Sequence, residues 1–241
     1  MSQATPKVCV AICNYNHELY LEEAIRSIVE QDYEHLDISV VDDGSSTDAA
    51  SEIVRKIGDG RVRLHRLEAN RGKWHGLNYS FSTTDAEICT AHDADDVSLP
   101  WRLSAQLTAL RATDTAHNLC GFVHCWNEDD VKKGRLMPGP ESLGCIPKED
   151  VVKMVMQGFR SPGCNHYYTG SFETAGVSAM FLKRVWEMGF RFNPPGMGLR
   201  VLHSEDSDFN CRVTLGLQST SILANTPYLY RRNTSTNREE K

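Results

Sequence analysis

The chain of 241 residues has the composition of an ordinary globular protein, with 40% hydrophobic and 24% charged residues. A chain of this length buries a sizeable core without disulfides or metal ions to hold it together. Its formal net charge of −6 argues against a nucleic-acid-binding surface, because contacts with phosphates need a face rich in Lys and Arg.

The N-terminal residues and the apolar segments bear on the compartment. Residues 1–6 lack the basic and long apolar regions of a signal peptide. No later stretch approaches the roughly 18 apolar residues of a membrane span. We therefore expect a cytoplasmic protein without a transmembrane segment, and peripheral attachment to a membrane stays open.

The eight cysteines include no Cys-x-x-Cys pair, so their spacing gives no support to a metal-binding framework. Three of them lie in apolar, strand-like runs: Cys9, Cys13 and Cys89. Two pairs combine cysteine with histidine, Cys164 with His166 and His124 with Cys125, but neither belongs to a complete four-ligand zinc set. We expect free thiols and no structural disulfide.

The first 130 residues alternate apolar runs with amphipathic segments. Strands are predicted over Lys7–Cys13, Leu36–Val41, Val62–Leu67 and Glu87–Ala91. Helices are predicted from a cap near Asn16 to Val29, over Asp48–Ile57, over Gly72–Phe81, and from Pro100 through Leu110. Repeated strand–helix units with almost entirely apolar strands predict a parallel sheet covered on both faces, with ligands beyond the carboxyl ends of the strands.

The second half is less regular. Strands are predicted over Gly121–Trp126 and Gly176–Phe181, and helices near Glu149–Gln157, just before Gly189 and over Glu205–Leu215. In the last helix, Phe209 and Val213 should face inward. The segment 134–174 is rich in Gly, Pro, Cys and aromatic residues, and long irregular segments of this kind usually bind something.

Two of the predicted strands end in carboxylates. Asp42 and Asp43 end the second strand, and Asp93, Asp95 and Asp96 end the fourth. Carboxylates at the tips of buried strands point to a common spot, where a hard cation or a hydroxyl-rich ligand would hold them together. A divalent metal ion that carries a nucleotide diphosphate fits this pattern, and a solvated acidic turn is the alternative.

Six segments, in order from about residue 7 to 235, resemble the motifs of family 2 glycosyltransferases with the GT-A fold. They are Val8–Asn16, Val41–Asp48, Asn70–Gly72 with Asn78, Asp93–Asp96, Gly176–Phe190 and Ser204–Asp208. The chain departs from the family at Cys13, where many members have Pro. No Gln-x-x-Arg-Trp follows Asp206 and no histidine follows it either, which resembles non-processive members and leaves no late histidine metal ligand.

The resemblance implies an α/β fold of GT-A (Rossmann-like) type, with a mostly parallel sheet flanked by helices and a smaller acceptor-side region. Residues 7–130 would form the nucleotide-sugar-binding half of a single domain. Residues 131–232 would form the half that binds the acceptor and carries the catalytic base. Residues 1–6 and 233–241 would be tails.

The resemblance also implies an inverting, metal-dependent hexosyl- or N-acetylhexosaminyl-transferase. It would move a sugar from a UDP-sugar to an acceptor hydroxyl in glycan, glycolipid or surface polysaccharide synthesis, with Mn²⁺ or Mg²⁺ as cofactor. Two alternatives stay open: a non-catalytic module that binds nucleotide sugars or glycans, and a nucleotidyltransferase. The latter needs a Gly-rich basic triphosphate loop, and the segment Cys13–Asn16 has none.

Chemistry and resemblance together assign the donor side. Asn14 and Tyr15 would bind the nucleotide, with the Tyr15 ring against the base, and Asp42 would accept the imide N–H of uracil. Asp93 would hold the ribose hydroxyls, and Asp95 would coordinate the metal that neutralises the departing diphosphate.

Three arginines are candidates for contacts with the donor. Arg71 is assigned to the nucleotide, and Arg231 and Arg232 are candidate diphosphate contacts. Each of them also fits a plain surface charge.

The acceptor side rests on the second half of the chain. Asp206 is the predicted general base, and a helix-dipole acid in a first turn is its alternative. Four residues are candidate acceptor contacts: His166, Tyr167, Tyr168 and Glu205.

Overall fold

The structure is a computed structural model, and it describes residues 5–139, 141–158, 176–195, 197, 205–232 and 234. The first half contains four parallel strands: β1 (Val8–Asn14), β2 (Leu36–Asp42), β3 (Val62–Arg66) and β4 (Ile88–Asp93). Four helices follow them: α1 (Glu18–Val29), α2 (Ala49–Ile57), α3 (Lys73–Thr83) and α4 (Arg102–Ala112). These elements lie where the hydrophobic pattern predicted them.

Five further strands, short or curved, follow β4 along the chain. They are β5 (Val97–Ser98), β6 (His117–Cys125), β7 (Cys145–Ile146), β8 (Met180–Leu182) and β9 (Thr220–Arg231). The helices of the second half are α5 (Glu128–Arg135), α6 (Lys148–Gly158), α7 (Lys183–Glu187) and α8 (Glu205–Leu217), with a 3₁₀ turn η1 (Gly176–Ser178). Among the described helices, none has the length and apolar character needed to cross a bilayer.

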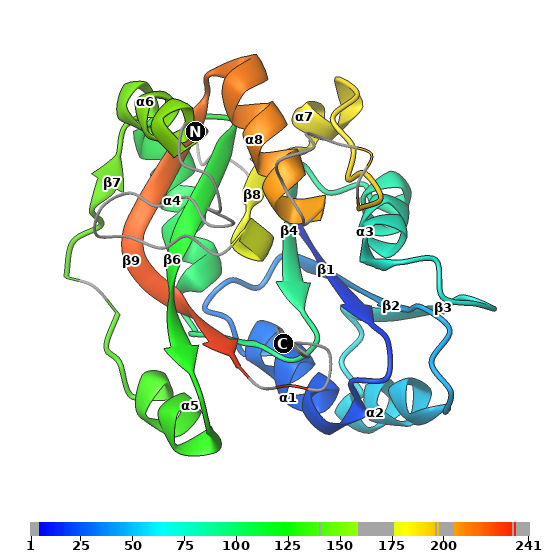
Figure 1. The fold of residues 1–241 in the computed structure, drawn as a ribbon. Helices are drawn as coiled ribbons and strands as arrows, with labels where there is room; N and C mark the ends of the chain where they lie inside the picture. The colour runs from blue at the N-terminus through cyan, green and yellow to red at the C-terminus, as the bar shows by residue number, and fades with distance from the viewer. Residues whose placement is uncertain are drawn as a thin grey trace, which may run out of the picture.

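All nine strands of the described residues form one sheet, in the order β3-β2-β1-β4-β8-β6-β9-β5 with β7 beside β9 (Figure 1). β8 runs antiparallel to both β4 and β6, whereas β6 and β9 are parallel. The α/β class with a central sheet flanked by helices is therefore confirmed. The parallel arrangement is continuous in the first half and mixed in the second.

Alternation along β1 explains how the sheet is covered on both faces. One set of its side chains packs against α1 and α2: Val8, Val10 and Ile12. The intervening set, Cys9 and Ala11, packs against α3 and α8. In α8, Phe209 and Val213 are fully buried, which confirms their inward prediction. Every second residue of a strand points to the same face, so an uninterrupted apolar run packs against helices on both faces of the sheet.

Two local details differ from the sequence prediction. The cap of α1, predicted near Asn16, is the next residue, His17, and Asn16 takes a left-handed φ of 56°. Its side-chain oxygen instead accepts the backbone N–H of Ser46 at 2.9 Å, which joins the loops after β1 and β2. The predicted strand Gly176–Phe181 begins as the turn η1, and only its last two residues belong to β8.

Strand β9 has no counterpart in the predicted elements. Asn225 and Pro227 interrupt its apolar pattern, and Pro cannot donate a hydrogen bond to a neighbouring strand. The structure accommodates Pro227 where the register with β6 shifts between Cys120 and Phe122. The bulge lets β9 continue to the edge of the sheet at which the acidic residues lie.

Candidate active site

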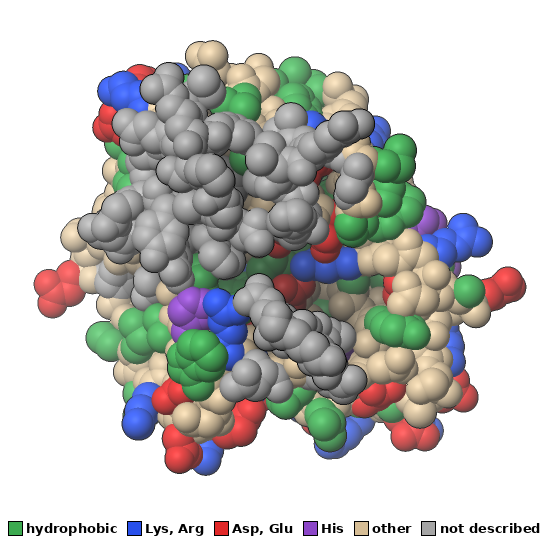
Figure 2. Space-filling model, viewed as in Figure 1, with side chains coloured by type: hydrophobic (Ala, Val, Ile, Leu, Met, Phe, Trp, Pro, Cys, Tyr) green, Lys and Arg blue, Asp and Glu red, His purple; other side chains and the backbone are tan. Residues whose placement is uncertain are grey.

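Polar and charged side chains converge where β1, β2, β4 and β9 end. The arrowheads of β4 and β9 approach the same region (Figure 1), and Figure 2 shows acidic and basic side chains together in a hollow near the centre of this face. This is the edge at which open α/β sheets bind ligands.

Three carboxylates after β4 form a cluster. Oxygen atoms of Asp93, Asp95 and Asp96 all lie within 4.8 Å of one another. Burial raises the pKa of Asp93 to about 6, because the charge of Asp95 adds to a desolvation that Lys73 only partly offsets. Burial and the charges of Asp93 and Asp95 also raise the pKa of Asp96 well above its ordinary value. The cluster therefore favours uptake of positive charge.

The cluster fits a divalent cation. Asp96 accepts the backbone N–H of Arg231 through Oδ1 at 2.8 Å, but its buried Oδ2 has no hydrogen-bond partner among the described residues. An unpaired buried carboxylate oxygen is costly. Mn²⁺ and Mg²⁺ prefer carboxylate oxygens, so Asp95 would hold such an ion, with Asp93 and Asp96 beside it.

Asp95 is held from both ends of the chain. Its Oδ2 accepts a hydrogen bond from Thr234 Oγ1 at 2.6 Å and lies 3.9 Å from His17 Nδ1. Its backbone oxygen accepts a bond from Arg231 Nη1 at 2.8 Å. The acidic loop is thus fixed by the loop after β1 and by the end of β9.

Lys73 is a site residue that the sequence interpretation missed. At the first position of α3, its Nζ lies 2.7 Å from Asp93 Oδ1 and 3.6 Å from Glu205 Oε1. Burial lowers the pKa of Lys73, but the carboxylates of Asp93, Glu205 and Asp206 outweigh it and raise the pKa well above its ordinary value. One ammonium therefore joins the end of β4 to the start of α8. The available signal was its place directly after the Asn70–Gly72 motif.

The predicted nucleotide residues Asn14 and Asp42 are brought together. Asn14 Nδ2 donates to Asp42 Oδ1 and to Ser45 Oγ, both at 3.1 Å. Asp42 Oδ2 lies 3.6 Å from Arg66 Nε and has no hydrogen-bond partner among the described residues. It is an acceptor with unused capacity at the end of β2. Tyr15, beside them, is 40% exposed, so part of its ring is open to a ligand.

Asp43, which the sequence interpretation did not assign, supports the next loop. Its two carboxylate oxygens accept the backbone N–H groups of Arg71 and Gly72, each at 2.8 Å. Gly44 has φ +74°, and a Cβ there would lie 2.7 Å from the carbonyl carbon of Ala69. The acidic turn and the loop before α3 therefore touch backbone to backbone. The Arg71 side chain is exposed.

The two neighbouring arginines at the end of β9 have different environments. Arg231 is only 3% exposed, and its guanidinium binds Glu23 and, with Nε at 3.1 Å, Glu128. Its charge is therefore already neutralised within the protein. Arg232 instead donates from Nε to His124 Nδ1 at 3.0 Å. Neither guanidinium contacts Asp93, Asp95 or Asp96 side chains in the bonds described.

The structure describes only some of the residues predicted for the acceptor side. Glu205 and Asp206 begin α8, and the charge of Asp206 acts on both Lys73 and Asp93. Asp206 Oδ1 accepts the N–H of Ser207 at 2.7 Å. Three further candidates lie outside the described residues: His166, Tyr167 and Tyr168.

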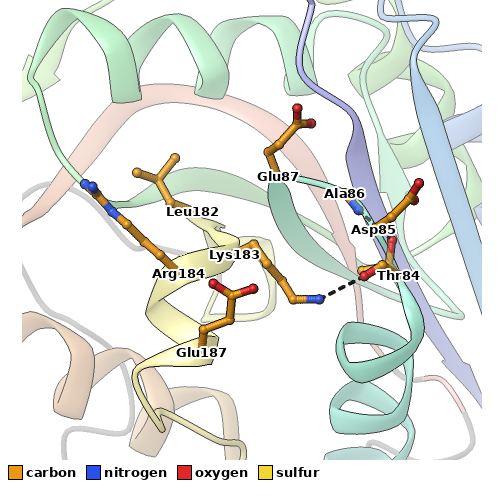
Figure 3. Close-up of a pocket in the computed structure, with 8 residues that line it drawn as sticks. All are labelled: Thr84, Asp85, Ala86, Glu87, Leu182, Lys183, Arg184 and Glu187. Atoms are coloured by element: carbon orange, nitrogen blue, oxygen red, sulfur yellow. Dashed lines mark hydrogen bonds between the residues drawn. The ribbon is translucent and has the colours of Figure 1, made fainter.

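A cavity of about 440 Å³ lies at the opposite end of the sheet. Figure 3 shows it where β4 begins and β8 passes into α7, lined by residues such as Glu87 and Glu187. Lys183 Nζ donates to the backbone oxygen of Thr84 at 3.0 Å across it. None of the predicted site residues lines this cavity, so it is separate from the acidic cluster.

Comparison with known proteins identifies the family of the chain. Residues 9–176 match the profile of the family described as glycosyl transferase family 2. An uncharacterized glycosyltransferase of Nostoc sp. is 31% identical over 153 residues, which cover 63% of this chain and 46% of that protein. A putative teichuronic acid biosynthesis glycosyltransferase of Bacillus subtilis is 24% identical over 179 residues, which cover 73% and 69%. The chain spans between 34% and 52% of the length of three curated relatives, the Nostoc protein among them.

Solved structures share the fold. S. aureus TarS 1–349 in complex with UDP-GlcNAc superposes with a TM-score of 0.65 at 17% identity, over 95% of this chain and 59% of that one. A mannosyltransferase from Pyrobaculum calidifontis in complex with GDP-Man and Mn²⁺ gives 0.61 at 19% identity, over 95% and 57%. At these identities the likeness establishes the GT-A arrangement of sheet and helices.

Proposed function

We propose, from the premise that the chain belongs to glycosyl transferase family 2, that it transfers a sugar from a UDP-sugar to an acceptor hydroxyl with inversion at the anomeric carbon. The observation that carries the proposal is the meeting of three carboxylates, Lys73 and the start of α8 at one edge of the sheet. This arrangement would supply a cation site, a fixed positive charge and a base within one hollow.

The donor would lie along the ends of β1, β2 and β4. Asp42 Oδ2, which has no hydrogen-bond partner in the described residues, would take the imide N–H of uracil, and the exposed part of Tyr15 would pack on the base. Asp93 would hold ribose hydroxyls. Asp95 would hold Mn²⁺ or Mg²⁺, which would supply positive charge to the leaving diphosphate.

The acceptor would be activated from α8. Asp206 would take the proton from the acceptor hydroxyl while that oxygen attacks the anomeric carbon from the side opposite the diphosphate. Displacement in this direction inverts the anomeric centre.

The names of the similar proteins support the donor and the pathway class. TarS has been solved with UDP and with UDP-GlcNAc, and hyaluronan synthase of Streptococcus pyogenes is 28% identical over 128 residues, which cover 50% of this chain and 30% of that protein. We therefore propose a hexosyl or N-acetylhexosaminyl donor and an acceptor in polysaccharide synthesis.

Calorimetry tests the donor site first. UDP should bind at least about tenfold more tightly with Mn²⁺ than with EDTA, and Asp95→Asn should abolish most of this difference. Asp129→Asn, an exposed aspartate on α5, is the matched control. Equal UDP affinity with Mn²⁺ and EDTA would rule out the metal assignment.

Turnover of UDP-GlcNAc to UDP tests the base. Asp206→Asn keeps the shape of the side chain but removes the proton acceptor, so the rate should fall by about 10²- to 10⁴-fold while UDP affinity changes less than about threefold. A near-normal rate in a folded Asp206→Asn enzyme would assign only a helix-capping role to Asp206.

A further inference from the structure

A cluster of aromatic side chains with one arginine lies beside the acidic hollow. We call it the aromatic platform, and its members are Phe122, His124, Trp126, Tyr230 and Arg232. β6 and β9 are parallel, with His124 opposite Tyr230. Because every second residue of a strand points to the same face, alternate residues at the two strand ends form one surface.

Ring contacts hold the platform together. The ring centroids of Phe122 and His124 are 4.7 Å apart, and those of Phe122 and Tyr230 are 5.5 Å apart. Trp126 lies 6.0 Å from His124 at an angle of 37°, and its side chain is 58% exposed. An indole fixed against neighbours yet open on one side offers a flat apolar surface to solvent. Histidine, basic and hydrophobic side chains gather beside the central hollow in Figure 2.

Arg232 adds a positive charge with free donors. Its guanidinium carbon lies 5.7 Å from the Trp126 ring centroid and 5.1 Å from that of Tyr230. Its Nε donates to His124, and within the described residues its two terminal nitrogens have neither a hydrogen bond nor an acidic partner. Arg231, by contrast, is paired with Glu23 and Glu128. The guanidinium of Arg232 is therefore oriented by the rings and available to an external anion.

The platform adjoins the proposed catalytic centre. Tyr228, on the same face of β9, accepts the backbone N–H of Asp93 at 3.2 Å. Burial raises the pKa of Tyr230 to about 12, with further contributions from the charges of Asp93 and Asp96. At a strand rise of about 3.3 Å per residue, Arg232 lies about 13 Å along β9 from Tyr228. The platform is thus beside the acidic cluster and continuous with it, but outside it.

We propose that the aromatic platform binds the acceptor, and that this acceptor is a glycan with an anionic group. A sugar ring would pack against Trp126, since the apolar C–H face of a sugar matches an indole. The anion would bind Arg232, whose planar guanidinium suits carboxylates and phosphates. The proposal rests on the proposed transferase function, and it places this second anion away from the donor diphosphate, which the acidic cluster and its metal would hold.

The test uses three soluble probes, measured by calorimetry and saturation-transfer NMR with UDP and Mn²⁺ present. Maltotetraose is neutral, tetragalacturonate carries carboxylates, and maltotetraose with a terminal phosphate carries a phosphate. At least one anionic probe should bind about tenfold more tightly than maltotetraose. Tighter binding of tetragalacturonate would indicate a uronate acceptor, and tighter binding of the phosphorylated probe would indicate a phosphate acceptor.

Matched variants attribute the binding to the platform. Arg232→Gln should remove the preference for the anionic probe, and Trp126→Ala should lower the affinity for every probe that binds by about tenfold. Exposed residues in α5 and at its C-terminal end supply the controls Lys132→Gln and Leu136→Ala, which should change nothing. Trp126→Ala and the two control variants should keep UDP affinity within about twofold, and circular dichroism should show that all four variants fold.

Three results would overturn the proposal. One is equal affinity for neutral and anionic probes, and another is an Arg232→Gln variant that behaves like Lys132→Gln. The third is a large loss of UDP affinity in Arg232→Gln, which would place this arginine in the donor site. In each case, intact UDP binding and UDP-GlcNAc turnover by the wild-type protein would leave the transferase function standing.

Discussion

Replacement of Lys73 by methionine removes one charge and keeps most of the side-chain length. In the native protein its ammonium lies 2.7 Å from Asp93 and 3.6 Å from Glu205. Removal of one partner of a buried ion pair costs about 3–5 kcal/mol. The Lys73 side chain is 28% exposed, and solvent therefore reduces this cost. We expect the free energy of unfolding to fall by about 2–3 kcal/mol.

The loss of stability in Lys73→Met should depend on whether a divalent metal ion is bound. A divalent ion with UDP would neutralise the same carboxylates, so the variant should gain more from Mn²⁺ than the wild type does. We expect the deficit in the free energy of unfolding to be about 2–3 kcal/mol in EDTA and below about 1 kcal/mol with Mn²⁺ and UDP. Urea unfolding at pH 7.5, followed by circular dichroism, measures both values.

The control is Lys132→Met, in a pair on the surface of α5 that should contribute less than about 1 kcal/mol. A Lys73→Met deficit of the same size in EDTA and in Mn²⁺ would refute the idea that ammonium and metal neutralise the same carboxylates. So would an unchanged stability in EDTA.

Three further predictions concern other parts of the molecule. Burial lowers the pKa of His117 to about 4, whereas this histidine has its ordinary pKa of about 6.5 in the unfolded chain. The unfolded chain therefore binds more protons below pH 6.5, and the free energy of unfolding decreases as pH falls. The variant His117→Gln should remove about 2 kcal/mol of this decrease between pH 7 and pH 5. Gly44→Ala should lower stability by about 2–3 kcal/mol and weaken UDP binding, because the new Cβ would meet the backbone of Ala69. Gly60→Ala is the control and should be nearly neutral, because a Cβ at Gly60 would meet open space. Burial raises the pKa of the Cys9 thiol to about 12, so iodoacetamide should leave Cys9 unmodified in the native protein and label it in urea, as mass spectrometry can check.

Each of these three has a clear contrary outcome. An unchanged pH slope in His117→Gln would mean that this histidine is not buried in its neutral form. Equal stability of the Gly44 and Gly60 variants would contradict the close approach at Ala69. Rapid native alkylation of Cys9 would contradict its burial in β1.

The first half of the fold was predictable because its signals are local. Each apolar run from β1 to β4 is short, is bounded by turn residues and is followed by a segment with helical spacing, so strand and helix need no information from elsewhere. The acidic ends of β2 and β4 were recognised for the same reason. In a parallel sheet, neighbouring carboxyl ends meet at one edge, which brought Asp42 and Asp93 to the same region.

The second half depends on partners that are distant in sequence. Pro227 weakens the strand pattern of β9, and it is accommodated by a bulge in β9 itself, where the register with β6 shifts between Cys120 and Phe122. Arg231 and Arg232 are adjacent and chemically identical, yet one is buried between Glu23 and Glu128 and the other lies against aromatic rings. A sequence pattern does not distinguish them, because the difference arises from which face of β9 each residue occupies.

The contacts between β9 and the acidic loop determine when the site can form during folding. Arg231 reaches the backbone of Asp95 across 136 residues, and Thr234 reaches its side chain across 139. Contacts of such long separation close late, because their loop-closure entropy is lost before they contribute any stability. The core of β1 to β4 can therefore collapse while the acidic loop is still unrestrained. In refolding, burial of apolar surface should precede the appearance of metal and nucleotide binding, and the docking of β9 at the Pro227 bulge should set the interval between the two.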